Sequence, residues 1–228
     1  MYNSHVTLLF RRKYTLPSTT ILLKIGILVV SFIIGIGFFY VTNQADKQTK
    51  KQQIDKFLSY TINFILFIWA AKIIVHISIF IEDPFAVLAY PSDSKSVYIA
   101  SVFIVAQIIY HKYRKDLKVN ELVTTLIPVF LATSFLYEFL QLIKVGGNHT
   151  LPNFLVVTVL LLLYIGLQDK WLHERLASLI VVLYSVAHIV FNIVFGYTVV
   201  YEYMLHPLYF IIIIIGTLVL LLKKRITN

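Results

Sequence analysis

The chain alternates between long apolar runs and short polar connections, and this pattern predicts its elements. A run of about 17–25 apolar residues is long enough to cross a bilayer as a helix. Seven runs reach or approach this length, and their approximate ranges are 20–42, 57–81, 96–111, 121–144, 151–168, 176–200 and 205–222. We therefore expect an all-α integral membrane protein with seven transmembrane helices in a single domain, residues 20–228. The polar stretch Asn43–Lys56 is expected to extend the first two helices into water.

The positions of the basic residues predict the orientation of these helices. Cytoplasmic connections of membrane proteins carry an excess of Lys and Arg. One set of alternate connections holds thirteen basic residues: Lys47, Lys50, Lys51, Lys56, Lys112, Arg114, Lys115, Lys118, Lys170, Arg175, Lys223, Lys224 and Arg225. The other set holds five, namely Arg11, Arg12, Lys13, Lys95 and Lys144. We therefore expect the amino terminus outside and the carboxyl terminus in the cytoplasm.

The composition agrees with a membrane protein and gives no reason to expect a nucleic-acid partner. The chain is 59% hydrophobic and 14% charged, whereas soluble domains are about 25% charged. The net charge of +9 is then explained by topology, and no nucleic-acid partner is expected. Residues 1–19 contain a basic cluster and are predicted to form an amphipathic outer arm along the outer lipid surface.

Several catalytic and metal-binding classes are disfavoured. Cysteine is absent, which removes disulfides, thiolate nucleophiles and cysteine metal sites. No Asp, Glu and His triplet has the spacing of zinc ligands. A haem between His76 and His188 is disfavoured because their expected depths differ by about 10 Å, and Ser185 near His188 lacks the acid of a hydrolase triad. We expect neither a metal nor a cofactor.

A small set of polar side chains falls inside the apolar runs. Lys72 and His76 lie one helical turn apart in the second run, with Lys72 about 13 Å from its outer end by helical rise. Glu138 lies about 9 Å from the outer end of the fourth run, and His188 and Asn192 lie deeper in the sixth. Charges at such depths usually face the bundle interior and pair. We expect a Lys72–Glu138 pair with His76 beside it; a purely structural pair or a snorkelling Lys72 are the alternatives.

The order of several short motifs resembles the prolipoprotein diacylglyceryl transferase family, over about residues 21–225. The second run contains "AAKI" (Ala70–Ile73), similar to that family's Gly-Ala-Arg-Leu, and "YSVAH" (Tyr184–His188) resembles its Tyr-Gly-x-x-Arg, with Asn192 where a Glu follows. Two further segments, "EDPFAVLAYPSD" (Glu82–Asp93) and "NELVTTLIPVF" (Asn120–Phe130), are similar to its outer loop and to the entry of its fourth span. The resemblance implies seven spans, an outer amino terminus and a bacterial plasma membrane. It also implies transfer of diacylglyceryl from phosphatidylglycerol to a lipoprotein cysteine.

The chain departs from the family at its main signatures. The family's His-Gly-Gly-Leu falls on "KSVYIASV" (Lys95–Val102), which has neither His nor Gly, and its fifth-span Tyr-Glu falls near "LPNFL" (Leu151–Leu155). Three arginine positions of the family read Lys72, Glu138 and His188. Arginine holds a phosphate through a planar two-pronged fork that lysine or histidine cannot copy. The departures therefore indicate an altered ligand or lost catalysis.

These observations predict a protein that binds an anionic phospholipid, such as phosphatidylglycerol, or a lipid-linked group in an outer-leaflet cavity without the full catalytic set. The expected binding residues are Lys72, His76, Glu138 and Asn192. One alternative is an active transferase, in which His188 acts as acid/base or charge stabiliser and Tyr184 orients the ligand. The other is a scaffold for a partner membrane protein or lipoprotein.

Overall fold

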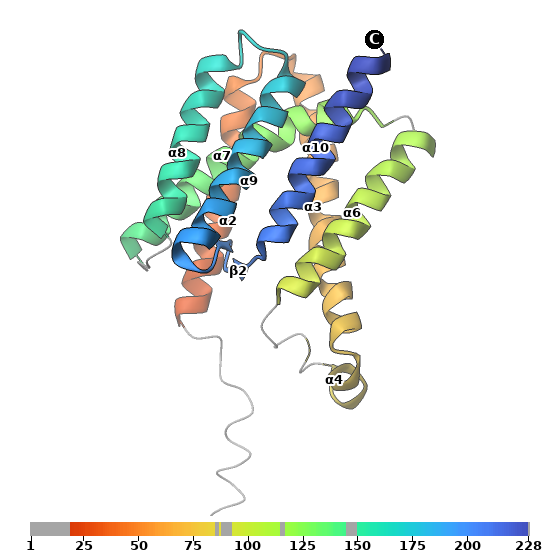
Figure 1. The fold of residues 1–228 in the computed structure, drawn as a ribbon, viewed down its shortest axis with the longest axis vertical. Helices are drawn as coiled ribbons and strands as arrows, with labels where there is room; N and C mark the ends of the chain where they lie inside the picture. Colours follow the sequence, from red (N-terminus) through yellow and green to blue (C-terminus); the bar gives the residue numbers. More distant parts are fainter. Residues whose placement is uncertain (1–18, 85–86, 88–92, 115–116, 145–149, 228) are drawn as a thin grey trace, which may run out of the picture.

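The computed structural model of the protein describes residues 19–84, 87, 93–114, 117–144 and 150–227, and it is almost entirely helical over them (Figure 1). Its long helices are α2 (Thr19–Thr42), α3 (Lys47–Val75), α6 (Ser94–Arg114), α7 (Val119–Lys144), α8 (Thr150–Leu167), α9 (His173–Phe195) and α10 (Pro207–Thr227). A short helix, α4 (Ile77–Glu82), follows α3. Between α9 and α10 lie two antiparallel strands, β1 (Val199–Val200) and β2 (Tyr203–Met204), with Val199 opposite Met204 and Val200 opposite Tyr203.

Five of these helices are long and apolar enough to cross a membrane: α2, α3, α7, α8 and α9. The apolar part of α10, Pro207–Leu222, is shorter, and α6 ends with basic residues in its last turn. Large apolar side chains cover the outer surface, as at Val41, which is 81% exposed, and Ile193, which is 76% exposed. Such a surface is stable in lipid and costly in water. The chain is therefore an all-α, multi-pass membrane protein, as the apolar runs predicted.

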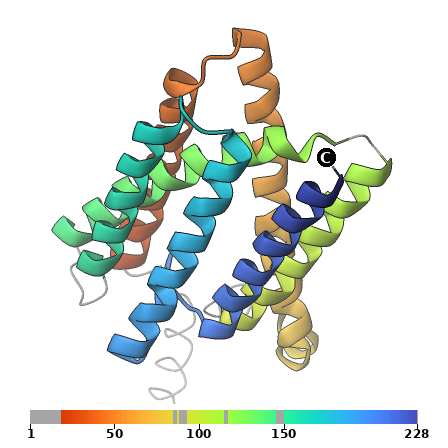
Figure 2. The same cartoon turned by 45° about the horizontal axis from the view of Figure 1, so that its top comes forward.

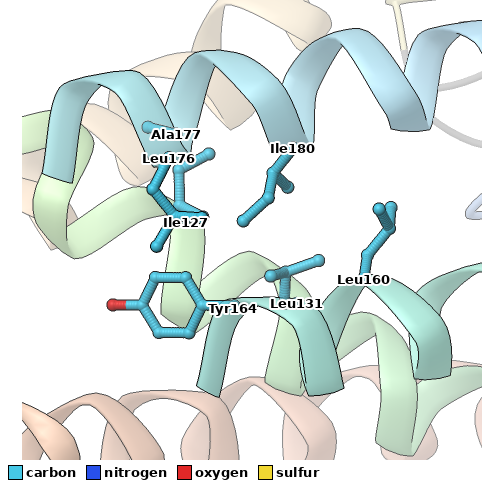
Figure 3. Packing of buried hydrophobic residues seen from close by; sticks show 7 residues of the cluster. All are labelled: Ile127, Leu131, Leu160, Tyr164, Leu176, Ala177 and Ile180. Atoms are coloured by element: carbon cyan, nitrogen blue, oxygen red, sulfur yellow. The ribbon is translucent and has the colours of Figure 1, made fainter. Parts of the chain in front are cut away.

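Helix α7 is the centre of the bundle. In the apolar 18-residue stretch of α7, 56% of the residues are buried, whereas the same share is 28% or less in the other four apolar helices. It packs against α2, α8, α9 and α3. The largest buried cluster lies where α7, α8 and α9 meet (Figure 3), and its members are Ile127, Leu131, Leu160, Tyr164, Leu176, Ala177 and Ile180. Polar groups placed on α7 are therefore enclosed by neighbouring helices.

Helices α2 and α7 approach closely at Gly35. A Cβ atom at this position would clash with Thr133 Oγ1 and would lie 2.8 Å from the carbonyl oxygen of Val129. Ser31, one turn earlier on α2, is fully buried. Small residues at a turn's spacing allow membrane helices to pack at short distance, so this contact fixes α2 against the central helix.

The remaining helices form the other side of the bundle. Helix α3 packs along α6, and α10 packs along α9; Figure 2 shows α3, α6 and α10 together on one side. Residues 43–46, residues 168–172 and the end of α10 all lie at one end of the bundle, at the top of Figure 1. We call this the C-terminal end. The opposite end carries α4 and the two strands, which form a hairpin. We call it the hairpin end.

The helix bounds agree with most predicted runs but differ in three places. The second helix begins at Lys47, where Asp46 Oδ2 accepts hydrogen bonds from the backbone N–H groups of Gln48 and Thr49 at 3.0 Å. The polar stretch thus extends the second helix but not the first, which ends at Thr42. The run 57–81 is interrupted at residue 76, and the run 176–200 ends in strands. The predicted outer arm, residues 1–19, falls almost wholly outside the described residues.

Candidate functional site

Lys72 lies in the last turn of α3, directly before the helix breaks. His76, with φ −116° and ψ 39°, separates α3 from α4, while its N–H still donates to the carbonyl oxygen of Lys72 at 3.0 Å. The Lys72 side chain is only 5% exposed. The predicted continuous helix is therefore wrong at this point, because the chain leaves the helical conformation at His76.

Asp93 links both basic side chains to the start of α6. Its Oδ1 accepts hydrogen bonds from Ser96 N at 2.9 Å and Ser96 Oγ at 2.7 Å, which is the arrangement of a helix N-cap. Its Oδ2 lies 3.6 Å from His76 Nε2. Burial raises the pKa of Asp93, but the Ser96 hydrogen bonds and the charges of His76 and Lys95 outweigh it and lower the pKa below its usual value. Asp93 is thus negatively charged at neutral pH, and its charge also attracts Lys72.

The expected Lys72–Glu138 pair is not formed. The ion pairs between described side chains are Lys24–Glu202, Lys56–Glu121, His76–Asp93 and Lys118–Glu121. Glu138, which is 8% exposed, instead accepts a hydrogen bond from Asn153 Nδ2 of α8 at 3.3 Å. The prediction was wrong because depth alone does not determine the partner. Helix α3 packs mainly along α6, whereas the side of α7 that carries Glu138 meets α8.

The strands belong to a hairpin, residues Thr198–Leu205, that closes with a hydrogen bond from Leu205 N to Thr198 O at 3.1 Å. Its two turn residues have positive φ, 47° at Tyr201 and 71° at Glu202. Two-residue hairpins require this conformation, usually supplied by Asn or Gly, and other residues pay about 1–3 kcal/mol each. Contacts with the bundle offset that cost: Tyr201 Oη lies 2.6 Å from Ser134 Oγ of α7.

Polar contacts hold the hairpin to α2, α6, α7 and α8. Glu202 Oε2 accepts from Lys24 Nζ of α2 at 2.7 Å, and Glu202 Oε1 accepts from Gln141 Nε2 of α7 at 3.3 Å. Asn153 Nδ2 of α8 donates to the carbonyl oxygen of Val199 at 2.9 Å. The Ser94 hydroxyl of α6 donates to the carbonyl oxygen of Met204. The hairpin therefore joins both sides of the bundle at the hairpin end.

His188, which lies in the sixth predicted run, contacts this hairpin from α9. His188 Nδ1 lies 2.8 Å from Thr198 Oγ1, and the His188 ring stacks on Phe210 and meets the Tyr184 ring edge-on, at centroid distances of 5.1 and 4.3 Å. The His188 side chain is 2% exposed, so a substrate would reach it only after one of its neighbours moved. Asn192 accepts the helix-ending hydrogen bond of Gly196 through its backbone oxygen at 2.9 Å.

The predicted site residues thus separate into two groups. Lys72 and His76 lie beside Asp93, at the α3–α6 side. Tyr184 and His188 lie beside the hairpin, and Glu138 shares its partner Asn153 with the hairpin backbone. The predicted roles of these residues, including Asn192, stay predictions.

The sequence analysis missed the hairpin and its partners Asn153 and Glu202. A signal was present inside the predicted run 176–200: glycine commonly ends a helix in the left-handed conformation, and Gly196 ends α9 in this way, with φ 77°. The β-branched residues Thr198, Val199 and Val200 follow it, as is typical of a strand. Among the described residues, no three His, Asp or Glu side chains come together as metal ligands.

Comparison of the chain with protein-family models, with curated proteins and with solved structures found no match.

Proposed function

We propose that this protein crosses a bacterial plasma membrane seven times, with the amino terminus outside, and binds the phosphate group of an anionic phospholipid such as phosphatidylglycerol. The binding group is the basic cluster, defined as Lys72, His76 and Lys95 around Asp93. This proposal keeps the lipid that the sequence resemblance implies but not the family's catalysis.

The grouping of basic side chains carries the proposal. Asp93 interacts electrostatically with Lys72, His76 and Lys95, so three basic side chains are gathered around one carboxylate. Basic groups near a membrane surface attract the phosphates of anionic head groups. The cluster lies where α3 ends and α6 begins, and we expect lipid head groups near the ends of membrane helices.

A non-catalytic role is favoured by the surroundings of the proposed catalytic residues. His188 is enclosed by Thr198, Phe210 and Tyr184, and it lies on α9 rather than on the α3–α6 side that carries the basic cluster. A transferase would need the lipid and the acid/base group in one place. The neighbour of His188 Nδ1 is instead the hairpin residue Thr198, at 2.8 Å.

Native mass spectrometry of the protein extracted with its lipids tests the lipid proposal. Phosphatidylglycerol should be retained in preference to phosphatidylcholine, and both Lys72→Met and the exposed Lys95→Gln should weaken this preference. The control is Lys144→Met, because Lys144 is an exposed lysine in the last turn of α7, outside the cluster. Equal retention of the two lipids, or equal retention by all variants, would refute the proposal.

Cysteine labelling tests the proposed orientation, and the chain has no native cysteine to interfere. The variant Lys144→Cys should react with an impermeant maleimide in intact cells. The variants Gln52→Cys and Lys170→Cys should react only after permeabilisation. The reverse pattern would invert the topology and move the basic cluster to the inner leaflet.

A further inference from the structure

Glu138 is a carboxylate with little compensation in the interior of the bundle. It lies within the apolar helix α7, and its hydrogen bond comes from a neutral amide, Asn153 Nδ2, at 3.3 Å. Glu202 also acts electrostatically on Glu138, but the charge of Glu202 is matched by Lys24 at 2.7 Å. With both carboxylates ionised, the three side chains together carry one excess negative charge, which is costly in a membrane.

Gln141 is an independent indication of a binding site on this face of α7. It lies three residues after Glu138 and so shares its face of α7, and it is 2% exposed. Its Nε2 donates to Tyr137 Oη at 2.8 Å and to Glu202 Oε1 at 3.3 Å. Its Oε1 is buried and accepts no hydrogen bond from any described residue. Buried polar atoms are nearly always satisfied, so this oxygen is an available ligand on a side chain that contacts Glu202 and shares the helix face of Glu138.

We propose that oxygen atoms of Glu138, Gln141 and Glu202 bind a monovalent metal cation of the Na⁺ class. Carboxylate and amide oxygens are the ligands of hard cations. A single positive charge would cancel the excess negative charge, whereas a divalent ion would reverse it. Because Glu202 belongs to the hairpin and the other two ligands to α7, the bound cation would fasten the hairpin to the central helix. The site uses no residue of the basic cluster and does not depend on lipid binding.

Thermal unfolding of the purified protein in detergent, in NaCl against choline chloride at equal ionic strength, tests this site. Choline is too large to enter the space between packed side chains. At a Na⁺ concentration about ten times Kd, the midpoint Tm should rise by about 3–6 °C. The rise should disappear in Glu138→Gln and be reduced in Gln141→Met.

Two matched variants serve as controls. Glu82→Gln removes an exposed carboxylate at the hairpin end, and Gln107→Met removes a glutamine of α6 whose Oε1 is likewise buried without a hydrogen bond among the described residues. Both should keep the Na⁺ effect. If Glu138→Gln does not fold, Gln141→Met against Gln107→Met decides the result. Equal Tm in the two salts would overturn the proposal. So would a Tm that rises with falling pH but ignores Na⁺, since Glu138 would then hold a proton.

Discussion

Replacing Gly35 by alanine should destabilise the protein, whereas the same replacement at Gly37 should not. Both glycines lie inside α2, and alanine at either position gains about 0.5–1 kcal/mol of helix stability. At Gly37 a Cβ atom meets nothing within 4 Å. At Gly35 it clashes with Thr133 Oγ1 and comes within 2.8 Å of the backbone oxygen of Val129, which cannot rotate away. Overpacking of this kind costs about 1–3 kcal/mol.

The difference between the two variants isolates the clash, because the gain in helix stability is common to both. We therefore expect Gly35→Ala to be less stable than Gly37→Ala by about 1–3 kcal/mol, measured by reversible unfolding in mixed detergent micelles. Adding Thr133→Ala should restore part of the loss, since Thr133 Oγ1 has no hydrogen-bond partner among the described residues. Equal stability of the two alanine variants would show that α2 and α7 are not in close contact at this point.

Three further changes test the polar contacts at the hairpin end. Asn153→Leu leaves the buried carbonyl oxygen of Val199 without its donor and should cost about 1–3 kcal/mol of unfolding free energy in the same assay. Lys24→Met should cost about 1 kcal/mol, because the pair with Glu202 is partly exposed; a double-mutant cycle with Glu202→Gln should give a favourable coupling energy, and additive losses would contradict the pair. The pKa of Asp93 is lowered in the folded protein, so its stabilisation is complete above about pH 4 and is lost as the pH falls through the folded pKa. Asp93→Asn should therefore flatten the acid limb of a Tm–pH profile, and an unchanged profile would exclude this contribution.

The apolar pattern predicted the helices well because lipid imposes the same requirement on every span. The bounds of α7 and α8, Val119–Lys144 and Thr150–Leu167, lie within two residues of the predicted runs 121–144 and 151–168. A membrane span must satisfy its backbone internally and cover it with apolar side chains, so hydropathy alone locates it.

Partners of polar side chains were predicted less well, because they depend on which helices become neighbours. Depth alone predicts a pair of Lys72 with Glu138. Because α3 packs along α6, Lys72 interacts electrostatically with Asp93 instead. The hairpin was missed for a related reason. Its turn residues, Tyr201 and Glu202, have low intrinsic preference for positive φ, and only contacts with distant helices stabilise them there.

The hairpin also has a consequence for biosynthesis. Glu202 and its partner Lys24 are separated by 178 positions in the chain. Asn153 and Val199, whose carbonyl oxygen it contacts, are separated by 46 positions. During membrane insertion, α2, α7 and α8 enter the bilayer before their polar partners have been synthesised. These contacts therefore form only after α9 and the hairpin have been made. A chain truncated before residue 198 would lack both of these contacts.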